Sequence, residues 1–145
     1  MRGYFGIGVF HSKTAENIGT LWRSAYNLGA DFIFTIGKRY SKQCSDVSKA
    51  WRKIPLYHYE NYEDFRRHIP YDCRLVAIEL DNKAKDLKLF THPERCIYLL
   101  GAEDHGLPQT IIDQCQETVM INSNLCMNVA VAGSIVMYDR QINAG

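Results

Sequence analysis

Residues 99–108 read Leu-Leu-Gly-Ala-Glu-Asp-His-Gly-Leu-Pro, so two glycines enclose three polar side chains that could contact a ligand. A strand-like run, 95–100, comes before them, and Pro108 suits the first turn of a helix. Ligands of open α/β sheets bind where strands end and helices begin. Gly101 permits close backbone approach to a ligand, and Gly106 permits a positive φ. The spacing matches neither GxGxxG nor the phosphate-binding lysine pattern, so a purely structural turn stays open at this point.

Two other segments carry polar side chains that could hold a substrate. Residues 17–23 read Asn-Ile-Gly-Thr-Leu-Trp-Arg, which puts Asn17 and Arg23 on neighbouring parts of one helix or its entry. Residues 124–132 read Asn-Leu-Cys-Met-Asn-Val-Ala-Val-Ala, and their small side chains would let a helix approach another backbone or a cofactor closely. Taken separately, these features also fit a solvated arginine and a tightly packed helix.

The elements that must position these residues alternate along the chain, which is typical of an α/β domain with a mostly parallel sheet. At 145 residues, the chain is predicted to form a single domain over 1–145. Short apolar runs predict strands at 4–10, 31–36, 56–59, 74–80, 95–100 and 118–121. Helical periodicity predicts helices at 15–28 with Thr14 as cap, at 62–68, at 108–115 and at 127–142.

Composition excludes several classes of protein. Hydrophobic residues make up 46% and charged residues 23%, which is the balance of a globular protein and not of a disordered one. No apolar run reaches the roughly 18 residues of a membrane span, and the first residues lack a secretory signal, so we expect a cytoplasmic protein. The five cysteines include no CxxC pair and no histidine at zinc-ligand spacing. We therefore expect reduced, mostly buried thiols and no metal site.

The charge is unevenly distributed, although the net charge is only +1. Residues 38–53 hold six basic side chains against one aspartate, and Tyr40 and Trp51 in the same stretch could stack on bases. The candidate nucleic-acid contacts there are Lys49, Arg52 and Lys53. A solvated basic loop is the alternative interpretation.

Taken together and in this order, the three polar segments resemble the motifs of the SPOUT superfamily of RNA methyltransferases, in its SpoU or TrmH branch, over about residues 5–141. Asn17, Gly19 and Arg23 match the N-x-G motif with its arginine. The second motif, L-G-x-E-x-x-G-L, is complete as Leu100, Gly101, Glu103, Gly106 and Leu107. The third, Ser-Leu-Asn-x-x-x-Ala, reads Cys-Met-Asn-Val-Ala-Val-Ala at 126–132, so Cys126 replaces the serine.

This resemblance implies a fold with a deep trefoil knot near the carboxyl end, an exception to the rule that chains avoid knots. It implies S-adenosylmethionine as cofactor, S-adenosylhomocysteine as product and no metal. By position, the residues lining the cofactor would be Ile78, Gly101, Ile121, Cys126 and Met127. It also implies a homodimer, with no membrane partner, in which Arg23 reaches the active site of the other subunit.

The reaction implied by the resemblance is methylation of a ribose 2′-hydroxyl, and positioning supplies much of its acceleration. The implied catalytic residues are Asn17, Arg23, Glu103 and Asn128. A guanidinium stays protonated, so we expect Arg23 to grip an RNA phosphate and stabilise the developing alkoxide rather than act as base. The other three would hold Arg23 and the ribose by hydrogen bonds.

The RNA substrate is expected to be a tRNA, because the subgroup that methylates the wobble ribose also consists of the catalytic domain alone. Two alternatives stay open: an rRNA-directed 2′-O-methyltransferase, and a catalytically weak knotted protein that binds RNA or assists assembly, suggested by Cys126 and the modest net charge. A nucleotide-binding dehydrogenase would need GxGxxG after the first strand, where this chain has His-Ser-Lys-Thr at 11–14.

Overall fold

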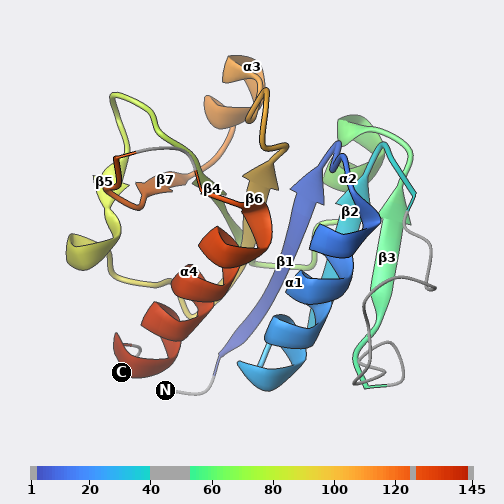
Figure 1. The fold of residues 1–145 in the computed structure, drawn as a ribbon, viewed down its shortest axis with the longest axis horizontal. Helices are drawn as coiled ribbons and strands as arrows, with labels where there is room; N and C mark the ends of the chain where they lie inside the picture. The colour runs from blue at the N-terminus through green and yellow to red at the C-terminus, as the bar shows by residue number, and fades with distance from the viewer. Residues whose placement is uncertain (1–2, 40–52, 125–126, 144–145) are drawn as a thin grey trace.

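The computed structural model describes residues 3–39, 53–124 and 127–143, and its centre is a parallel sheet with helices on both faces (Figure 1). The strands are β1 (Tyr4–Phe10), β2 (Phe32–Ile36), β3 (Leu56–Tyr59), β4 (Arg74–Ile78), β5 (Lys85–Asp86), β6 (Arg95–Gly101) and β7 (Glu117–Met120). The helices are α1 (Ala15–Asn27), α2 (Tyr62–Arg67), α3 (Gln109–Ile112) and α4 (Val129–Asn143), with a short 3-10 helix at Leu87–Leu89. All paired strands in the described residues are parallel, in the order β3-β2-β1-β6-β4-β7-β5, which confirms the predicted fold class.

The strand expected at 74–80 ends at Ile78, the helix expected at 108–115 is shortened, and the sequence prediction missed β5 and the 3-10 helix at Leu87–Leu89. The helix expected at 108–115 is α-helical only over Gln109–Ile112, because its last turn tightens into i→i+3 bonds. There the amide of Gln114 donates to the carbonyl of Ile111 at 3.0 Å, and Cys115 donates to Ile112 at 3.1 Å. β5 has only two residues, too few to produce a periodic pattern, so the prediction missed it.

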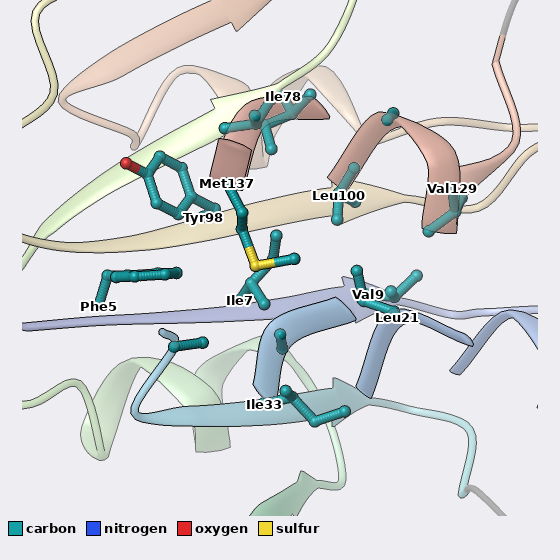
Figure 2. Close-up of a cluster of buried hydrophobic side chains, with 14 of the residues drawn as sticks. Phe5, Ile7, Val9, Leu21, Ile33, Ile78, Tyr98, Leu100, Val129 and Met137 are labelled. Atoms are coloured by element: carbon teal, nitrogen blue, oxygen red, sulfur yellow. The ribbon is translucent and has the colours of Figure 1, made fainter. Parts of the chain in front are cut away.

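The sheet is buried on both faces, and β6 at its centre shows this most clearly. Cys96, Tyr98 and Leu100 point toward the layer of α1 and α4, where they join the main core (Figure 2). Ile97 and Leu99 point to the opposite layer, which holds α2 and α3. Apolar residues on both faces of a strand are what parallel sheets covered by helices require.

Helix α4 lies beside α1 on one face of the sheet (Figure 1) and approaches it closely at Gly133. A Cβ on Gly133 would lie 2.6 Å from Cδ1 of Leu21 and 3.3 Å from Cδ1 of both Ile7 and Leu100. Ala130 and Ala132, the small residues of the predicted segment at the start of this helix, are buried as well, and Gly133 extends this row into close contact with α1 and the sheet.

Strand β7 enters the sheet between β4 and β5, both of which come earlier in the chain. This late strand therefore lies between two strands that follow each other directly in the chain. The trefoil knot itself stays a prediction.

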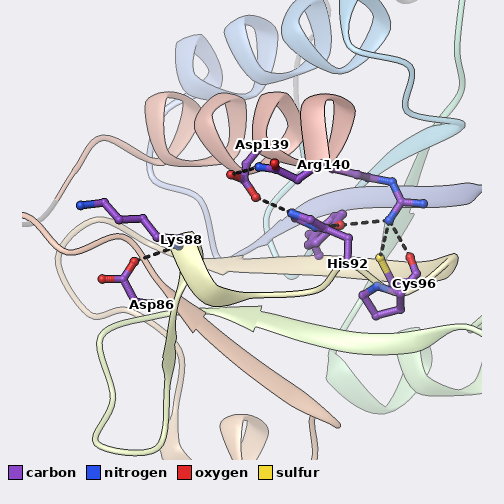
Figure 3. Close-up of polar contacts among 9 residues, drawn as sticks. Asp86, Lys88, His92, Cys96, Asp139 and Arg140 are labelled. Carbon is purple, nitrogen blue, oxygen red and sulfur yellow. Dashed lines mark hydrogen bonds and ion pairs between the residues drawn. The ribbon is translucent and has the colours of Figure 1, made fainter. Parts of the chain in front are cut away.

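The far end of α4 is fastened by a buried polar cluster (Figure 3). Arg140 Nη1 donates to the Tyr98 hydroxyl at 3.1 Å, and the guanidinium also donates to the carbonyls of residues 93 and 94 at 2.7 and 2.9 Å. His92 contacts the Tyr98 hydroxyl through Nδ1 and the Asp139 carboxylate through Nε2, both at 2.7 Å. Burial lowers the pKa of His92. The cluster joins α4 to the start of β6.

Among the described cysteines, Cys73, Cys96 and Cys115 are free thiols, and of these only Cys96 is fully buried. Burial raises the pKa of the Cys115 thiol to about 11, so this side chain is a neutral thiol at pH 7. The described helices include none that is long and apolar enough to cross a membrane.

We predict that Arg140→Met lowers the free energy of unfolding by about 3 kcal/mol, because buried acceptors lose their charged donor. Urea denaturation of the variant measures this loss. Arg67→Met is the matched control, since Arg67 is exposed and its ion pair with Asp64 lies at the surface. Equal midpoints for the two variants would contradict a stabilising role for the cluster.

Candidate functional site

The carboxyl ends of β4 and β6 meet the segment after β7 at one edge of the sheet, and a cavity of about 250 Å³ lies there. Parallel strands bring their carboxyl ends to the same edge, which is where ligands of open α/β sheets bind. The predicted cofactor residues among the lining side chains and backbone are Ile78, Gly101, Ile121 and Met127, and Glu103 lines the cavity as well. Their contact with a cofactor stays a prediction, and Cys126 lies outside the described residues.

Both glycines of the loop after β6 are sterically required. A Cβ on Gly101 would collide with the backbone of Gly106 and Leu107. The absence of a side chain at Gly101 therefore lets the loop pack against itself, in addition to any ligand. Gly106 has φ +65°, as predicted, and its amide donates to the carbonyl of Ala102 at 2.8 Å. The loop thus folds back on itself and presents its backbone to the cavity.

Glu79, just after β4, is a site residue that the sequence analysis missed. One of its carboxylate oxygens accepts from the backbone amide of Leu107 at 2.8 Å, and the other accepts from the amide of Leu80 at 3.2 Å. It lines the cavity and closes against Gly106, where a Cβ would lie 2.5 Å from Oε2. The available signal was an acidic residue near the end of an otherwise apolar strand-like run.

Three of the four predicted catalytic residues form one hydrogen-bonded chain. Asn17 Nδ2 donates to the carboxylate of Glu103, and Asn128 Nδ2 donates to Asn17 Oδ1 at 2.9 Å. Asn128 Oδ1 in turn accepts from the amides of Ala130 and Val131 at 2.9 and 3.2 Å, which makes Asn128 the cap of α4. The contact therefore links the first turn of α1, the glycine loop and the first turn of α4.

Arg23, the fourth predicted catalytic residue, lies farther along α1 and is half-buried. Six residues of helix separate it from Asn17 by about 9 Å along the axis. It is not among the residues that line the cavity. Within one chain, the structure therefore brings the cofactor-loop residues together with Asn17 and Asn128 but leaves Arg23 outside the cavity wall.

An ion pair lies on the rim of the cavity. The ammonium of Lys13, in the loop before α1, lies 2.7 Å from Asp104 Oδ2, and His105 Nε2 lies 3.1 Å from the same oxygen. Lys13 lowers the pKa of Asp104, and Asp104 raises the pKa of Lys13. Of the predicted nucleic-acid contacts, Lys53 is exposed, whereas Lys49 and Arg52 lie outside the described residues.

We predict that Asn128→Ala lowers the free energy of unfolding by about 1 kcal/mol, because the amides at the start of α4 lose their acceptor. Asn128→Ser is the matched control: serine caps helices as well as asparagine, but its shorter side chain lacks the amide nitrogen that donates to Asn17. Urea denaturation should show a loss for alanine and little change for serine. A serine variant as unstable as the alanine variant would assign the stability to the Asn17 contact instead.

Solved structures with the same fold are RNA-modifying proteins. An AdoMet-bound rRNA methyltransferase from Sinorhizobium meliloti matches with a TM-score of 0.85 at 20% identity, over 100% of this chain and 58% of that one. A protein studied for 2-OH methylation of C/U34 on tRNA matches with a TM-score of 0.82 at 21% identity, over 99% of both chains. The TrmH/SpoU tRNA modifying enzyme of A. aeolicus matches with a TM-score of 0.85 at 14% identity, over 98% of this chain and 76% of that one.

These structural similarities establish the fold. The chain spans 58% of the length of the Sinorhizobium protein. No curated protein matches the sequence. The model of the SpoU rRNA Methylase family matches residues 5–138, nearly the whole of the segment in which the three motifs stand. The resemblance seen in Asn17, Glu103 and Asn128 is thereby confirmed, and the chain belongs to the SpoU rRNA Methylase family.

Proposed function

We propose that this chain is an S-adenosylmethionine-dependent methyltransferase that modifies a ribose 2′-hydroxyl of tRNA in the cytoplasm. One observation carries the proposal. Glu103, beside the cavity, is joined by Asn17 to Asn128, so three motifs that are far apart in the sequence meet at one site. Family membership and AdoMet-bound proteins of the same fold support the same reaction class.

The cavity suits an adenosyl group with a charged tail. Its wall is largely apolar, with Ile78, Leu100 and Ile121 among the side chains, while the turned loop after Gly101 offers backbone donors and acceptors. Apolar walls with a few placed polar groups are typical of cofactor sites. S-adenosylmethionine, when bound, supplies a methyl group made electrophilic by its sulfonium.

The residues around the cavity would then position the ribose. The ribose 2′-oxygen would accept the methyl group that the cofactor supplies, S-adenosylhomocysteine would leave, and the 2′-proton would pass to a phosphate or to solvent. Glu103 and Asn128 orient the nucleotide by hydrogen bonds, and Arg23 holds an RNA phosphate and stabilises the negative charge that develops on the oxygen. These roles require that the side chains position the ribose and stabilise charge, and they require no side chain that gains or loses a proton at pH 7.

A tRNA is the substrate we favour over rRNA. The protein studied for 2-OH methylation of C/U34 on tRNA matches this chain over 99% of both, and the TrmH/SpoU tRNA modifying enzyme of A. aeolicus has the same fold. Residues 38–53, with Lys49, Arg52 and Lys53, stay our candidates for RNA recognition.

We predict that Arg23→Ala lowers methyl transfer to tRNA at least about 100-fold, the usual cost of losing a group that stabilises the transition state. Its calorimetric affinity for S-adenosylmethionine should stay within about twofold, because Arg23 lies outside the cavity wall. Gly101→Val should instead lose cofactor affinity, since its side chain would displace the loop. Circular dichroism checks that both variants fold.

Loss of cofactor affinity in the Arg23 variant would refute its assignment to the RNA side of the site. Absence of cofactor binding by the unaltered protein would favour the knotted RNA-binding protein over an enzyme.

We further propose that the active form is a homodimer assembled through α4. Apolar residues at helical spacing stand exposed along one side of this helix: Val131, Ile135, Tyr138 and Ile142. Such stripes mark interfaces. A second copy of the chain is the partner we favour. Arg23 lies outside the cavity wall of its own chain, and in a dimer it would reach the cavity of the other chain.

A mixing experiment tests whether Arg23 acts across the interface. Arg23→Ala retains the cavity, and Gly101→Val retains the arginine, so a mixed dimer contains one complete site. Random re-association of equal amounts makes about half of the dimers mixed, and the mixture should recover about a quarter of the original activity. Two folded variants that stay inactive together would place Arg23 in the site of its own chain.

A further inference from the structure

The rim ion pair between Lys13 and Asp104 lies between the cavity and open solvent. The side chain of Lys13 is 59% exposed, that of Asp104 35% and that of His105 84%. A single oxygen, Asp104 Oδ2, therefore faces an ammonium and an imidazole, both of which extend into water. Exposed pairs of this kind contribute little stability, so another anion can replace the carboxylate at small cost.

The backbone that carries Lys13 is held firmly, in contrast to the exposed end of its side chain. The amide of His11 donates to the carbonyl of Ile36 at 2.9 Å, and the buried Ser12 hydroxyl donates to the carbonyl of Thr14 at 3.3 Å. Lys38 Nζ donates to the carbonyl of Lys13 at 3.0 Å, which brings a second cation to the same loop. The ammonium of Lys13 is thus exposed to solvent, while the backbone that carries it is held by hydrogen bonds.

The position of this pair suits a phosphate that enters with the substrate. Asp104 directly follows Glu103 in the glycine loop. Lys13 contacts Asp104, and Asn17 contacts Glu103, so Lys13 lies next to the hydrogen-bonded residues of the site. Phosphate contacts set the register and orientation of a nucleic acid without reading its bases. A phosphate held at Lys13 would lie beside the nucleotide that the site must position.

We propose that Lys13 is a positioning residue that binds a backbone phosphate of the RNA, and that Asp104 holds its ammonium in the free protein and releases it when the phosphate arrives. The inference rests on the proposed function and adds one specific contact to it. Lys13 exchanges one anion for another, so no bond is made or broken and no proton moves. Asp104 then keeps its contact with the His105 ring.

Two substitutions should change RNA affinity in opposite directions. Lys13→Gln removes the phosphate contact and should weaken binding of unmodified tRNA about tenfold, with the salt dependence of binding reduced by about one ion. Asp104→Asn removes the competing anion and should tighten binding about threefold. In the Lys13→Gln background, Asp104→Asn should tighten binding less than it does in the protein that keeps Lys13, because no ammonium is left for it to release. Lys13→Arg should keep most of the affinity.

Fluorescence anisotropy with a labelled tRNA transcript, measured without cofactor at several salt concentrations, gives each Kd. Lys88→Gln is the matched control and should leave the Kd unchanged, because Lys88 is exposed on the 3-10 helix away from the cavity lining. Binding by the unaltered protein with no change for Lys13→Gln, or weaker binding for Asp104→Asn, would overturn this inference alone. No binding of tRNA by the unaltered protein would overturn the tRNA proposal as well.

Discussion

The side-chain amide of Asn17 is shared between two partners, and the rest of the site depends on that sharing. Its nitrogen donates to Glu103, 86 residues away, and its oxygen accepts from Asn128, 111 residues away. One amide can serve both only when the glycine loop and the first turn of α4 lie against α1 at the same time. The two hydrogen bonds of Asn17 can therefore form together only when these three segments are packed as in the folded protein.

Helix α4 transmits this constraint along its length. Asn128 caps the start of the helix, and Gly133, in its second turn, lets it lie against α1 and the sheet. At the far end, Arg140 donates to the carbonyls of residues 93 and 94, just before β6. The contacts at the two ends of α4 lie at opposite ends of β6, because the glycine loop follows that strand and the carbonyls of residues 93 and 94 precede it. The orientation of the cavity wall is thus set by rigid elements rather than by a loop alone.

Most elements of the fold could be predicted because a buried parallel sheet leaves a strong pattern. The run at 95–100 is apolar on both faces and became β6, and Thr14 caps α1 as its position predicts. Two residues of β5 leave no such pattern, and the tightening that shortens α3 depends on the geometry of its last turn. Glu79 escaped notice because an acid at a strand end has a local signal no different from that of any surface carboxylate.

The sequence by itself determined which groups are available: the motif residues around Asn17, Glu103 and Asn128, the two glycines of the loop, and the family to which they belong. Only the tertiary structure decided that Asn17 joins the other two, that Glu79 supports the loop at Leu107, and that Lys13 meets Asp104 on the rim. The reason is physical. Hydrogen bonds and ion pairs act over a few ångströms between residues that strand order alone brings together, so they leave no periodic trace along the chain.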